Sequence, residues 1–257
     1  MKTKTIAVAN EKGGVGKTVT VINLAAALTL ENKKVLVVDM DPQANATKGL
    51  GIDSAVEGRS VYDLIHPGGA ALADIITPTA WKGLDVIPSH SDLAGAEVEL
   101  LDVEGRENLL ADALGKLPAE YDFVLLDTPP SLSLLTVNVF AFARQVLIPC
   151  QTHPYAYGAL SELCDTVDAV QEEINSDIAI LGIVPTFYDI RTRVSQQVLS
   201  QLRSDDRYKE LLFDTVVRSN TTIAESAAVG KPVVFYRSSS FGAVDYRDLA
   251  GEVISKS

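Results

Sequence analysis

The sequence has little cysteine and no long apolar run. Of its 257 residues only Cys150 and Cys164 are cysteines, and they do not form a C-x-x-C pair. We therefore expect buried free thiols in a reducing compartment, with a thiolate-held cluster shared between subunits as the alternative. The absence of 18 consecutive apolar residues excludes a membrane-spanning helix. Residues 1–5 lack a signal-peptide cleavage pattern, so a cytoplasmic protein is predicted.

An excess of basic charge is also missing. The net charge is −12, which argues against a protein whose whole surface binds nucleic acid. The charge is unevenly distributed, because Arg191 to Arg247 holds nine Lys or Arg against six Asp or Glu. That segment carries +3 and the rest of the chain −15, so either a local basic face or an ordinary solvated helix surface is compatible with this pattern.

Linkers, repeats and low-complexity tracts are absent as well, and apolar and amphipathic segments alternate along the chain. We expect a single domain over residues 1–257, an α/β fold with one doubly wound, mostly parallel sheet flanked by helices. Residues 44–83 are expected to form short helices and loops, with Ser60 capping a helix. The predicted strands are 5–9, 35–38, 84–87, 121–127, 145–149, 178–184 (closed by Pro185) and 211–217. The predicted helices are 19–30, 91–103, 107–117, 132–142, 155–174, 192–202, 222–229 and 244–255.

The most informative stretch is a glycine-rich turn between the first predicted strand and helix. It reads Glu11-Lys-Gly-Gly-Val-Gly-Lys-Thr18 and ends like the phosphate-binding pattern G-x-x-x-x-G-K-[ST]. Glycines allow backbone N–H groups to converge on an anion, Lys17 would reach the β- and γ-phosphates, and the Thr18 hydroxyl would hold Mg²⁺. The first glycine of the pattern is replaced by Glu11, and a second lysine, Lys12, follows it.

Carboxylates end two further buried strands. Asp39 and Asp41 follow residues 35–38, and Asp127 follows residues 123–126 in the manner of a Walker B strand. The C-terminal edge of a parallel sheet is where open α/β folds bind ligands, so these carboxylates are expected beside the glycine-rich turn.

Three motifs together resemble the ParA/Soj group of deviant Walker A ATPases, in the ParA/MinD superfamily. They are Lys12-Gly-Gly-Val-Gly-Lys-Thr18, Asp39-Met-Asp-Pro-Gln43 and Leu126-Asp-Thr-Pro-Pro130, and the likeness extends across nearly the whole chain. It also includes Asn45-Ala-Thr47, Tyr188-Asp-Ile-Arg191, Asn220 and Gly230-Lys-Pro232.

The resemblance implies an ATPase with weak intrinsic activity that binds ATP and Mg²⁺ and then forms a homodimer around two nucleotides. Lys12 would reach phosphates bound by the other subunit, Asp41 would position the attacking water, and Asp39 would support the metal held by Thr18 and Asp127. Lys12, Lys17 and Asp41 are thus the implied catalytic residues. The implied nucleotide-binding residues are Lys12, Gly13, Gly14, Val15, Gly16, Lys17, Thr18 and Val19.

The resemblance further implies that the ATP dimer binds DNA without sequence preference and associates with the nucleoid. Arg191 and Arg193 fall where the family places one contact, whereas Thr222 stands where relatives often carry arginine. Arg218, Lys231, Arg237 and Arg247 are candidates to compensate. A ParB-like or cargo-adaptor protein would stimulate hydrolysis, and the cargo is left open among chromosome, plasmid, protein cluster and microcompartment.

Three other functions are less compatible with the sequence. A MinD-like membrane-cycling ATPase needs a C-terminal amphipathic helix rich in lysine, whereas residues 248–257 contain one lysine and no aromatic residue. A small-molecule synthetase needs a convergent substrate pocket, and His66, His90 and His153 are scattered. An iron–sulfur reductase needs a cysteine soon after Asp127, where the sequence has none.

Overall fold

One twisted sheet forms the centre of the molecule. The computed structural model describes residues 2–53, 60–117 and 120–257, and within these ranges seven strands pair in the order β3-β4-β2-β5-β1-β6-β7. All pairings are parallel except that of β3 with β4. The strands are β1 (Lys4–Val8), β2 (Val35–Asp39), β3 (Thr77–Pro78), β4 (Leu84–Ile87), β5 (Phe123–Asp127), β6 (Gln145–Gln151) and β7 (Ala179–Thr186).

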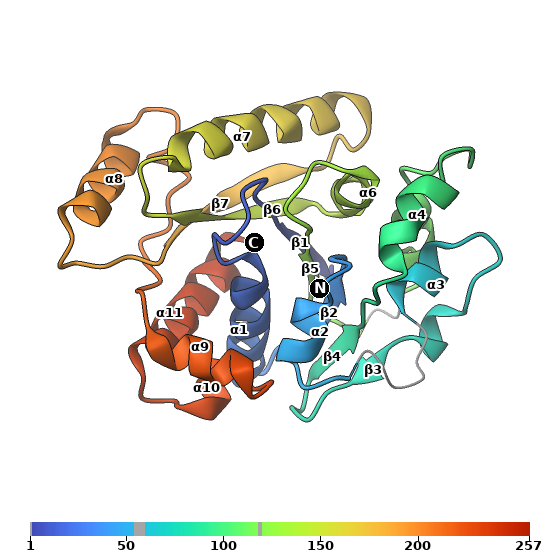
Figure 1. Ribbon diagram of the computed structural model, residues 1–257, viewed down its shortest axis with the longest axis horizontal. Coiled ribbons are helices and arrows are strands. Elements are labelled where there is room, and N and C mark those ends of the chain that lie inside the picture. Colours follow the sequence, from blue (N-terminus) through green and yellow to red (C-terminus); the bar gives the residue numbers. More distant parts are fainter. Residues whose placement is uncertain (1, 54–59, 118–119) are drawn as a thin grey trace.

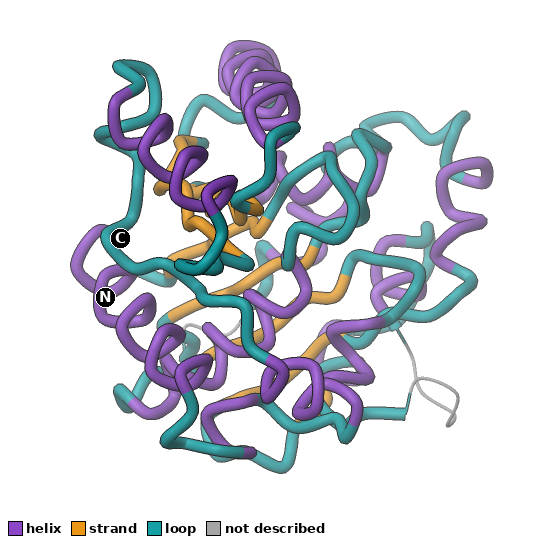
Figure 2. Tube along the Cα trace, turned by 60° about the vertical axis from the view of Figure 1, so that its left-hand side comes forward, coloured by secondary structure: helices purple, strands orange, loops and turns teal. Residues whose placement is uncertain are grey.

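Helices cover both faces of this sheet, as the prediction of a doubly wound fold requires (Figures 1 and 2). One layer consists of α1 (Lys17–Leu30), α2 (Asn45–Gly49), α9 (Thr221–Ala228), α10 (Val233–Tyr236) and α11 (Phe241–Lys256). The other consists of α3 (Val61–Ile65), α4 (Leu93–Glu99), α5 (Leu109–Leu114), α6 (Leu134–Phe142), α7 (Ala156–Glu173) and α8 (Arg193–Ser204), with a short 3₁₀ turn at Leu72–Asp74. Among the described helices, none combines the length and apolar character needed to cross a bilayer.

The strands are buried because each layer packs on one of their faces. β2 and β5 are buried along their whole length, which explains their nearly continuous apolar sequences. Alternate residues of β1 belong to different cores: Ile6 and Val8 pack with α1 and α11, whereas Ala7 packs with the α6–α7 layer. The alanine-rich face of α1 lies directly on the sheet, with Ala25, Ala26 and Ala27 fully buried.

The register of the central strands brings three functional loops to one edge. Asp127 at the end of β5 pairs with Val8 at the end of β1 and, on its other side, with Asp39 at the end of β2. The glycine-rich turn leaves β1 at the same level. This arrangement confirms the expectation that the carboxylates and the turn meet at the C-terminal edge of the sheet.

The prediction of a strand over residues 211–217 was wrong. This segment follows the outer edge of β7 but makes only isolated bridges, Ile183 with Leu212 and Tyr188 with Arg218. The backbone N–H groups of Asp214 and Thr215 donate instead to the carboxylate of Glu252 on α11, at 3.0 and 2.7 Å. A side chain from a distant helix therefore takes the donors that a continuous ladder would use.

Other elements differ in extent from the expectation. β7 continues through Pro185 to Thr186, because the Pro185 carbonyl faces the open edge and accepts from Val217 N–H, so no ladder donor is missing there. The helices expected over 91–103 and 107–117 are shorter in the structure, where they correspond to α4 and α5. The predicted Ser60 cap is present, with Asp63 completing a capping box. Residues 54–59 of the expected loop region lie outside the described residues.

Candidate functional site

The glycine-rich turn forms a loop around the N-terminus of α1. Gly14 and Gly16 have φ values of +76° and +94°, a left-handed conformation that residues with a Cβ rarely adopt. Gly16 is the N-cap of α1, so the unpaired backbone N–H groups of the first helical turn face the loop. A loop of this shape at a helix N-terminus is a binding site for phosphate.

Lys17 points back into the loop. Its Nζ donates to the carbonyl of Asn10 at 2.8 Å and to that of Lys12 at 3.2 Å, and the residue is only 7% exposed. Burial lowers the pKa of Lys17, and the nearby carboxylates of Asp127 and Asp41 oppose that shift. The ammonium group is thus held inside the loop, where a phosphate chain would lie.

Lys12 is arranged in a different way. Its backbone N–H donates to Asn10 Oδ1 at 2.9 Å, but its half-buried side chain has no hydrogen bond or ion pair with any residue that the structure describes. The neighbouring Glu11 side chain is fixed by α7, because Thr166 donates to Glu11 Oε1 at 3.2 Å. The loop therefore contains one lysine whose ammonium group is bound inside it, and one whose ammonium group has no partner in the described part of the chain.

Asp127 is the side chain best suited to hold a metal cation. Both carboxylate oxygens are buried and neither has a hydrogen-bond partner among the described residues. Burial, together with the charge of Asp39, raises the pKa of Asp127, while the nearby Thr18 hydroxyl opposes the shift. A buried carboxylate without partners beside a hydroxyl is a donor set that suits Mg²⁺. The residues present therefore fit the metal that the sequence predicts.

Asp39 is used mainly to shape the loop that follows β2. Its Oδ2 accepts from the backbone N–H and the hydroxyl of Thr47, at 2.8 and 2.7 Å, and its Oδ1 accepts from Asp41 N–H at 3.2 Å. Burial raises the pKa of Asp39 to about 6, and these hydrogen bonds oppose the shift.

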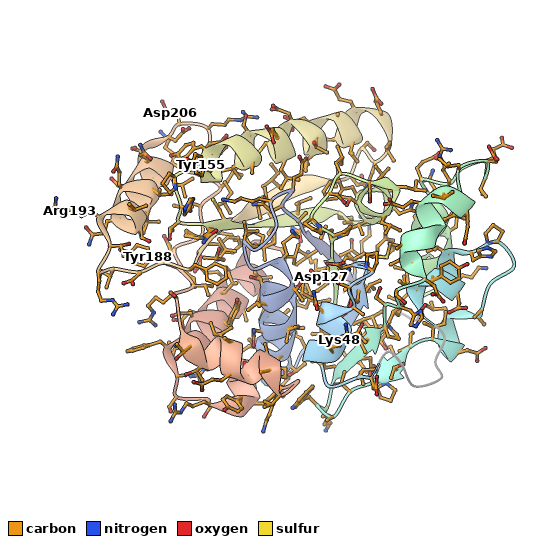
Figure 3. All side chains as sticks on the ribbon, viewed as in Figure 1. Lys48, Asp127, Tyr155, Tyr188, Arg193 and Asp206 are labelled. Atoms are coloured by element: carbon orange, nitrogen blue, oxygen red, sulfur yellow. The ribbon has the colours of Figure 1, made fainter. Side chains whose placement is uncertain are left out.

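Asp41 completes the carboxylate group at this edge. It is 7% exposed, and its Oδ1 accepts from Gln43 N–H at 2.9 Å. Asp41 lies two residues after the end of β2, and its charge is one of those that oppose the lowering of the Lys17 pKa. Figure 3 shows Asp127 in the middle of the molecule.

An apolar pocket adjoins the loop on the side of α9 and α11. It is lined by Gly16, Val19, Thr186, Phe187, Val217, Arg218, Asn220, Ile223, Ala224 and Tyr246. Phe187 has a positive φ of 51°, and a Cβ on Gly16 would lie 3.2 Å from its ring, so the ring packs against the loop. Apolar walls with a few polar groups at the rim are typical of a pocket for a planar base.

The candidate DNA-binding residues fall into two groups. Arg191 and Arg193 lie on the exposed loop and first turn of α8, and Arg193 projects away from the molecule (Figure 3). The Arg191 guanidinium is paired with Asp189 but is 85% exposed. Lys231 and Arg237 are exposed on the segments before and after α10.

Arg218 has a more buried environment than the other candidates. Its backbone N–H and guanidinium both donate to the buried carboxylate of Asp245, and the guanidinium lies 4.3 Å from the ring centroid of Phe241. Arg218 therefore lies on the rim of the apolar pocket and not on an open basic surface. The sixth candidate, Arg247 on α11, donates from its guanidinium to the carbonyls of Ala243 and Ser238. Contact with DNA stays a prediction for all six residues.

Sequence reasoning assigned no role to three residues that hold the site together. Asn10 links the loop to β6 through Pro149 O at 2.9 Å, Thr186 donates to Val15 O at 2.8 Å, and Thr47 binds Asp39. Asn10 directly follows the predicted strand 5–9, a position that could have drawn attention to it, whereas Thr186 ends the observed strand β7, two residues beyond the predicted end at residue 184.

The fold and the loop define the class of the protein: a P-loop nucleotide-binding protein with a deviant Walker A motif. The sequence profile of the AAA domain family matches residues 3–180. The chain is 43% identical to the sporulation initiation inhibitor protein Soj of Bacillus subtilis, covering 97% of this chain and 98% of Soj. It is 41% identical to the chromosome partitioning protein ParA of Myxococcus xanthus, covering 98% and 88%.

A solved structure agrees with these relatives in fold. Cobyrinic acid a,c-diamide synthase of Mycobacterium smegmatis, with a bound ATP analogue and magnesium, has a TM-score of 0.83 and 37% identity. The comparison covers 97% of this chain and 93% of that chain. The chain belongs to the ParA/Soj family of ATPases, within the ParA/MinD superfamily.

Proposed function

We propose that this ATPase is a dimerising switch that binds DNA without sequence preference in its ATP state and positions a cargo. The whole chain would act as one domain. A ParB-like or cargo-adaptor partner would stimulate hydrolysis and release the dimer. The observation that carries the proposal is the pair of lysines in one loop, Lys17 bound to the loop interior and Lys12 without a side-chain partner among the described residues.

The substrate is ATP and the metal is Mg²⁺. Residues 12–19 would surround the phosphates, with the free N–H groups at the start of α1 and the Lys17 ammonium as donors. Thr18 and the unpartnered Asp127 would hold the metal, which neutralises phosphate charge when bound. Asp39 would act on the metal indirectly, through the loop that it shapes. The apolar pocket beside Gly16 would take the adenine.

Hydrolysis requires a water molecule placed in line with the bond that breaks. The water oxygen forms a bond to the γ-phosphorus, the bond to the ADP oxygen breaks, and the water protons leave with inorganic phosphate and solvent. Asp41 would orient this water, because it is a nearly buried carboxylate that shares the site with Lys17.

Lys12 would complete the site of the other subunit. Lys12 has no anionic partner among the residues that the structure describes, whereas across a dimer interface its ammonium group can stabilise charge on the partner's γ-phosphate. The same logic explains arginine fingers supplied in trans.

DNA binding is proposed for the α8 loop. Arg191 and Arg193 are exposed, close in sequence and at the outer edge of the molecule, so two copies in a dimer would present four guanidinium groups to phosphates. Such contacts are independent of sequence and weaken with salt. The protein would then be cytoplasmic and associate with the nucleoid when ATP is bound.

The alternative of a MinD-like membrane cycle is less well supported. The apolar face of α11, including Tyr246, Leu249 and Val253, is buried against the rest of the protein, so it is not available to a lipid surface.

The synthase named among the similar structures raises a second alternative, a small-molecule synthetase. The three histidines lie on separate loops and provide no convergent substrate site among the described residues.

An ATP-dependent binding assay tests the proposal. The Asp41→Ala variant, expected to hold the ATP state, should retard duplexes of unrelated sequence equally with ATP and not with ADP. Loss of retardation in Arg191→Ala plus Arg193→Ala would locate the surface. If no nucleotide state bound DNA at low salt, while ATP-dependent binding to anionic vesicles occurred, the membrane alternative would replace the proposal.

A further inference from the structure

The hydroxyl of Thr47 lies at a junction of three segments. It donates to Asp39 Oδ2 at 2.7 Å and accepts from the backbone N–H of Ser89 at 3.0 Å. Asp39 ends β2, Thr47 is on α2, and Ser89 follows β4. All three residues are almost completely buried, at 0%, 0% and 1% exposure. Buried groups of this kind hold their geometry because water cannot replace a broken hydrogen bond.

We propose that Thr47 is a positioning residue for ATP hydrolysis, acting on Asp41 through Asp39. This inference rests on the proposed role of Asp41 in orienting the attacking water. No contact of Thr47 with the phosphate loop is involved. The effect passes through the shape of the chain between Asp39 and α2.

The path from Thr47 to Asp41 consists of consecutive hydrogen bonds. Thr47 binds Oδ2 of Asp39 with two donors, and this fixes the carboxylate so that its Oδ1 can accept from Asp41 N–H at 3.2 Å. The Asp41 carbonyl accepts from Ala44 N–H at 2.9 Å, and its Oδ1 accepts from Gln43 N–H. The backbone and the carboxylate of Asp41 are thus both tied to this turn.

The turn needs such support because it is strained. Ala44 is buried and has a φ of +53°, a left-handed conformation that is unfavourable for a residue with a Cβ. Strained backbone of this kind persists only where surrounding contacts determine it, and it clusters at functional sites. The Asp39–Thr47–Ser89 junction supplies those contacts from both sides of the turn.

The junction also explains the choice of threonine at this position. The Asp39 carboxylate requires a donor and the Ser89 N–H requires an acceptor, and one hydroxyl provides both. Serine has the same capacity, whereas valine has the shape of threonine without the polar atom. The pair Thr47→Ser and Thr47→Val therefore separates hydrogen bonding from packing.

Single-turnover ATP hydrolysis tests the inference, with the rate normalised to the number of ATP molecules bound. Thr47→Val should lower the rate by about tenfold or more, the size typical for residues that orient a group in direct contact with the reaction. Its affinity for ATP should stay within about twofold, because the phosphate loop is untouched. Thr47→Ser should keep a rate close to that of the natural protein.

A matched control removes an equivalent hydroxyl at the opposite end of the strands. Thr5 is buried near the start of β1, and its Oγ1 accepts from Arg144 N–H at 3.0 Å, so Thr5→Val loses a similar bond away from the site. The hydrolysis rate of folded Thr5→Val should be unchanged. If Thr47→Val does not fold, Thr47→Ala, which adds no methyl group against Asp39, is measured by the same criteria.

The outcomes separate this inference from the role of Asp41. Adding Thr47→Val to Asp41→Asn should have no further effect on the rate if Thr47 acts through Asp41. The inference would be overturned if Thr47→Val hydrolysed ATP at the normal rate, or if its affinity for ATP fell as much as its rate. It would also be overturned if Thr47→Ser showed the same defect as Thr47→Val. A normal rate in Asp41→Asn would instead overturn the proposed role of Asp41, and with it the path from Thr47.

Discussion

Asp39 and Asp127 are register partners at the ends of the adjacent parallel strands β2 and β5, and both side chains are completely buried. Two carboxylates in this arrangement disfavour simultaneous ionisation, and burial raises the pKa of each. Asp39 has three hydrogen-bond donors, whereas Asp127 has no partner among the described residues. Without a cation, the ionised form of at least one of the two carboxyls is therefore disfavoured, and a bound Mg²⁺ would stabilise the ionised form of both.

The first prediction concerns pH. The pKa of Asp39 is raised to about 6 from 3.8, so the folded protein binds more protons than the unfolded chain between these values. Asp39 therefore favours the folded state most at pH values below about 4, and this contribution to the free energy of unfolding falls as pH rises from about 4 to 6. A bound Mg²⁺ favours the ionised form of the carboxylates beside it, so the increase in melting temperature on adding Mg²⁺–ATP should grow as pH rises through about 6, from pH 5 to pH 7.

Asp127→Asn provides the control for this prediction. Removing the ionisable group should stabilise the ligand-free protein at pH 7, because burial and the neighbouring Asp39 disfavour the charge of Asp127. The same variant should lose the Mg²⁺-dependent increase in melting temperature. An unchanged response to Mg²⁺ would show that Asp127 is not part of the metal site.

The second prediction concerns Lys17. Lys17→Ala should weaken ATP binding by at least about 100-fold, since hydrogen bonds to charged groups contribute about 1.5–3 kcal/mol each. It also leaves the carbonyls of Asn10 and Lys12 without their donor. Titration with a fluorescent ATP analogue measures the affinity, and circular dichroism checks the fold. An affinity equal to that of the natural protein would refute the phosphate-loop assignment.

The third prediction concerns the base pocket. Phe187→Ala removes a wall that packs against Gly16, so ATP affinity should fall by about tenfold, equivalent to about 1.4 kcal/mol. Magnesium tripolyphosphate has no base, and its affinity should not change. Competition titrations with the two ligands separate the effects. A parallel loss for both ligands would mean that Phe187 supports the phosphate loop instead of the base.

The fourth prediction concerns salt. Replacing Arg191 and Arg193 by alanine should reduce the slope of log affinity for duplex DNA against log salt, by about one unit for each arginine that binds a phosphate. The double variant Arg203→Ala plus Arg207→Ala, with side chains elsewhere on and after α8, is the matched control. Equal reductions in slope for both pairs would place the DNA surface over the whole of α8 instead of its first turn.

Sequence reasoning located the phosphate loop and the three carboxylates because their signals are local. The apolar runs before Glu11, Asp39 and Asp127 indicate strands, and parallel strands must end at one edge. The same reasoning also identified the doubly wound topology. These features depend on short stretches of chain.

Features that depend on tertiary contacts were not accessible in this way. Glu252 takes the backbone donors of residues 214 and 215, so an apolar segment that resembles a strand does not pair as one. Arg218 was named as a candidate DNA contact, but the sequence did not indicate that Asp245 holds it at the rim of an apolar pocket. The support of Asp39 by Thr47 requires α2 to fold back over β2, which no local pattern indicates.

The most direct test of the proposed switch is the oligomeric state of a Lys12 variant with ATP bound. In the Asp41→Ala background, which should prevent hydrolysis, light scattering after size exclusion with Mg²⁺–ATP should give a dimer. Adding Lys12→Ala should give a monomer that still binds one ATP, because Lys17 and the rest of its own loop are intact. A dimer that forms equally well without the Lys12 ammonium would contradict the nucleotide-dependent switch proposed for this ATPase.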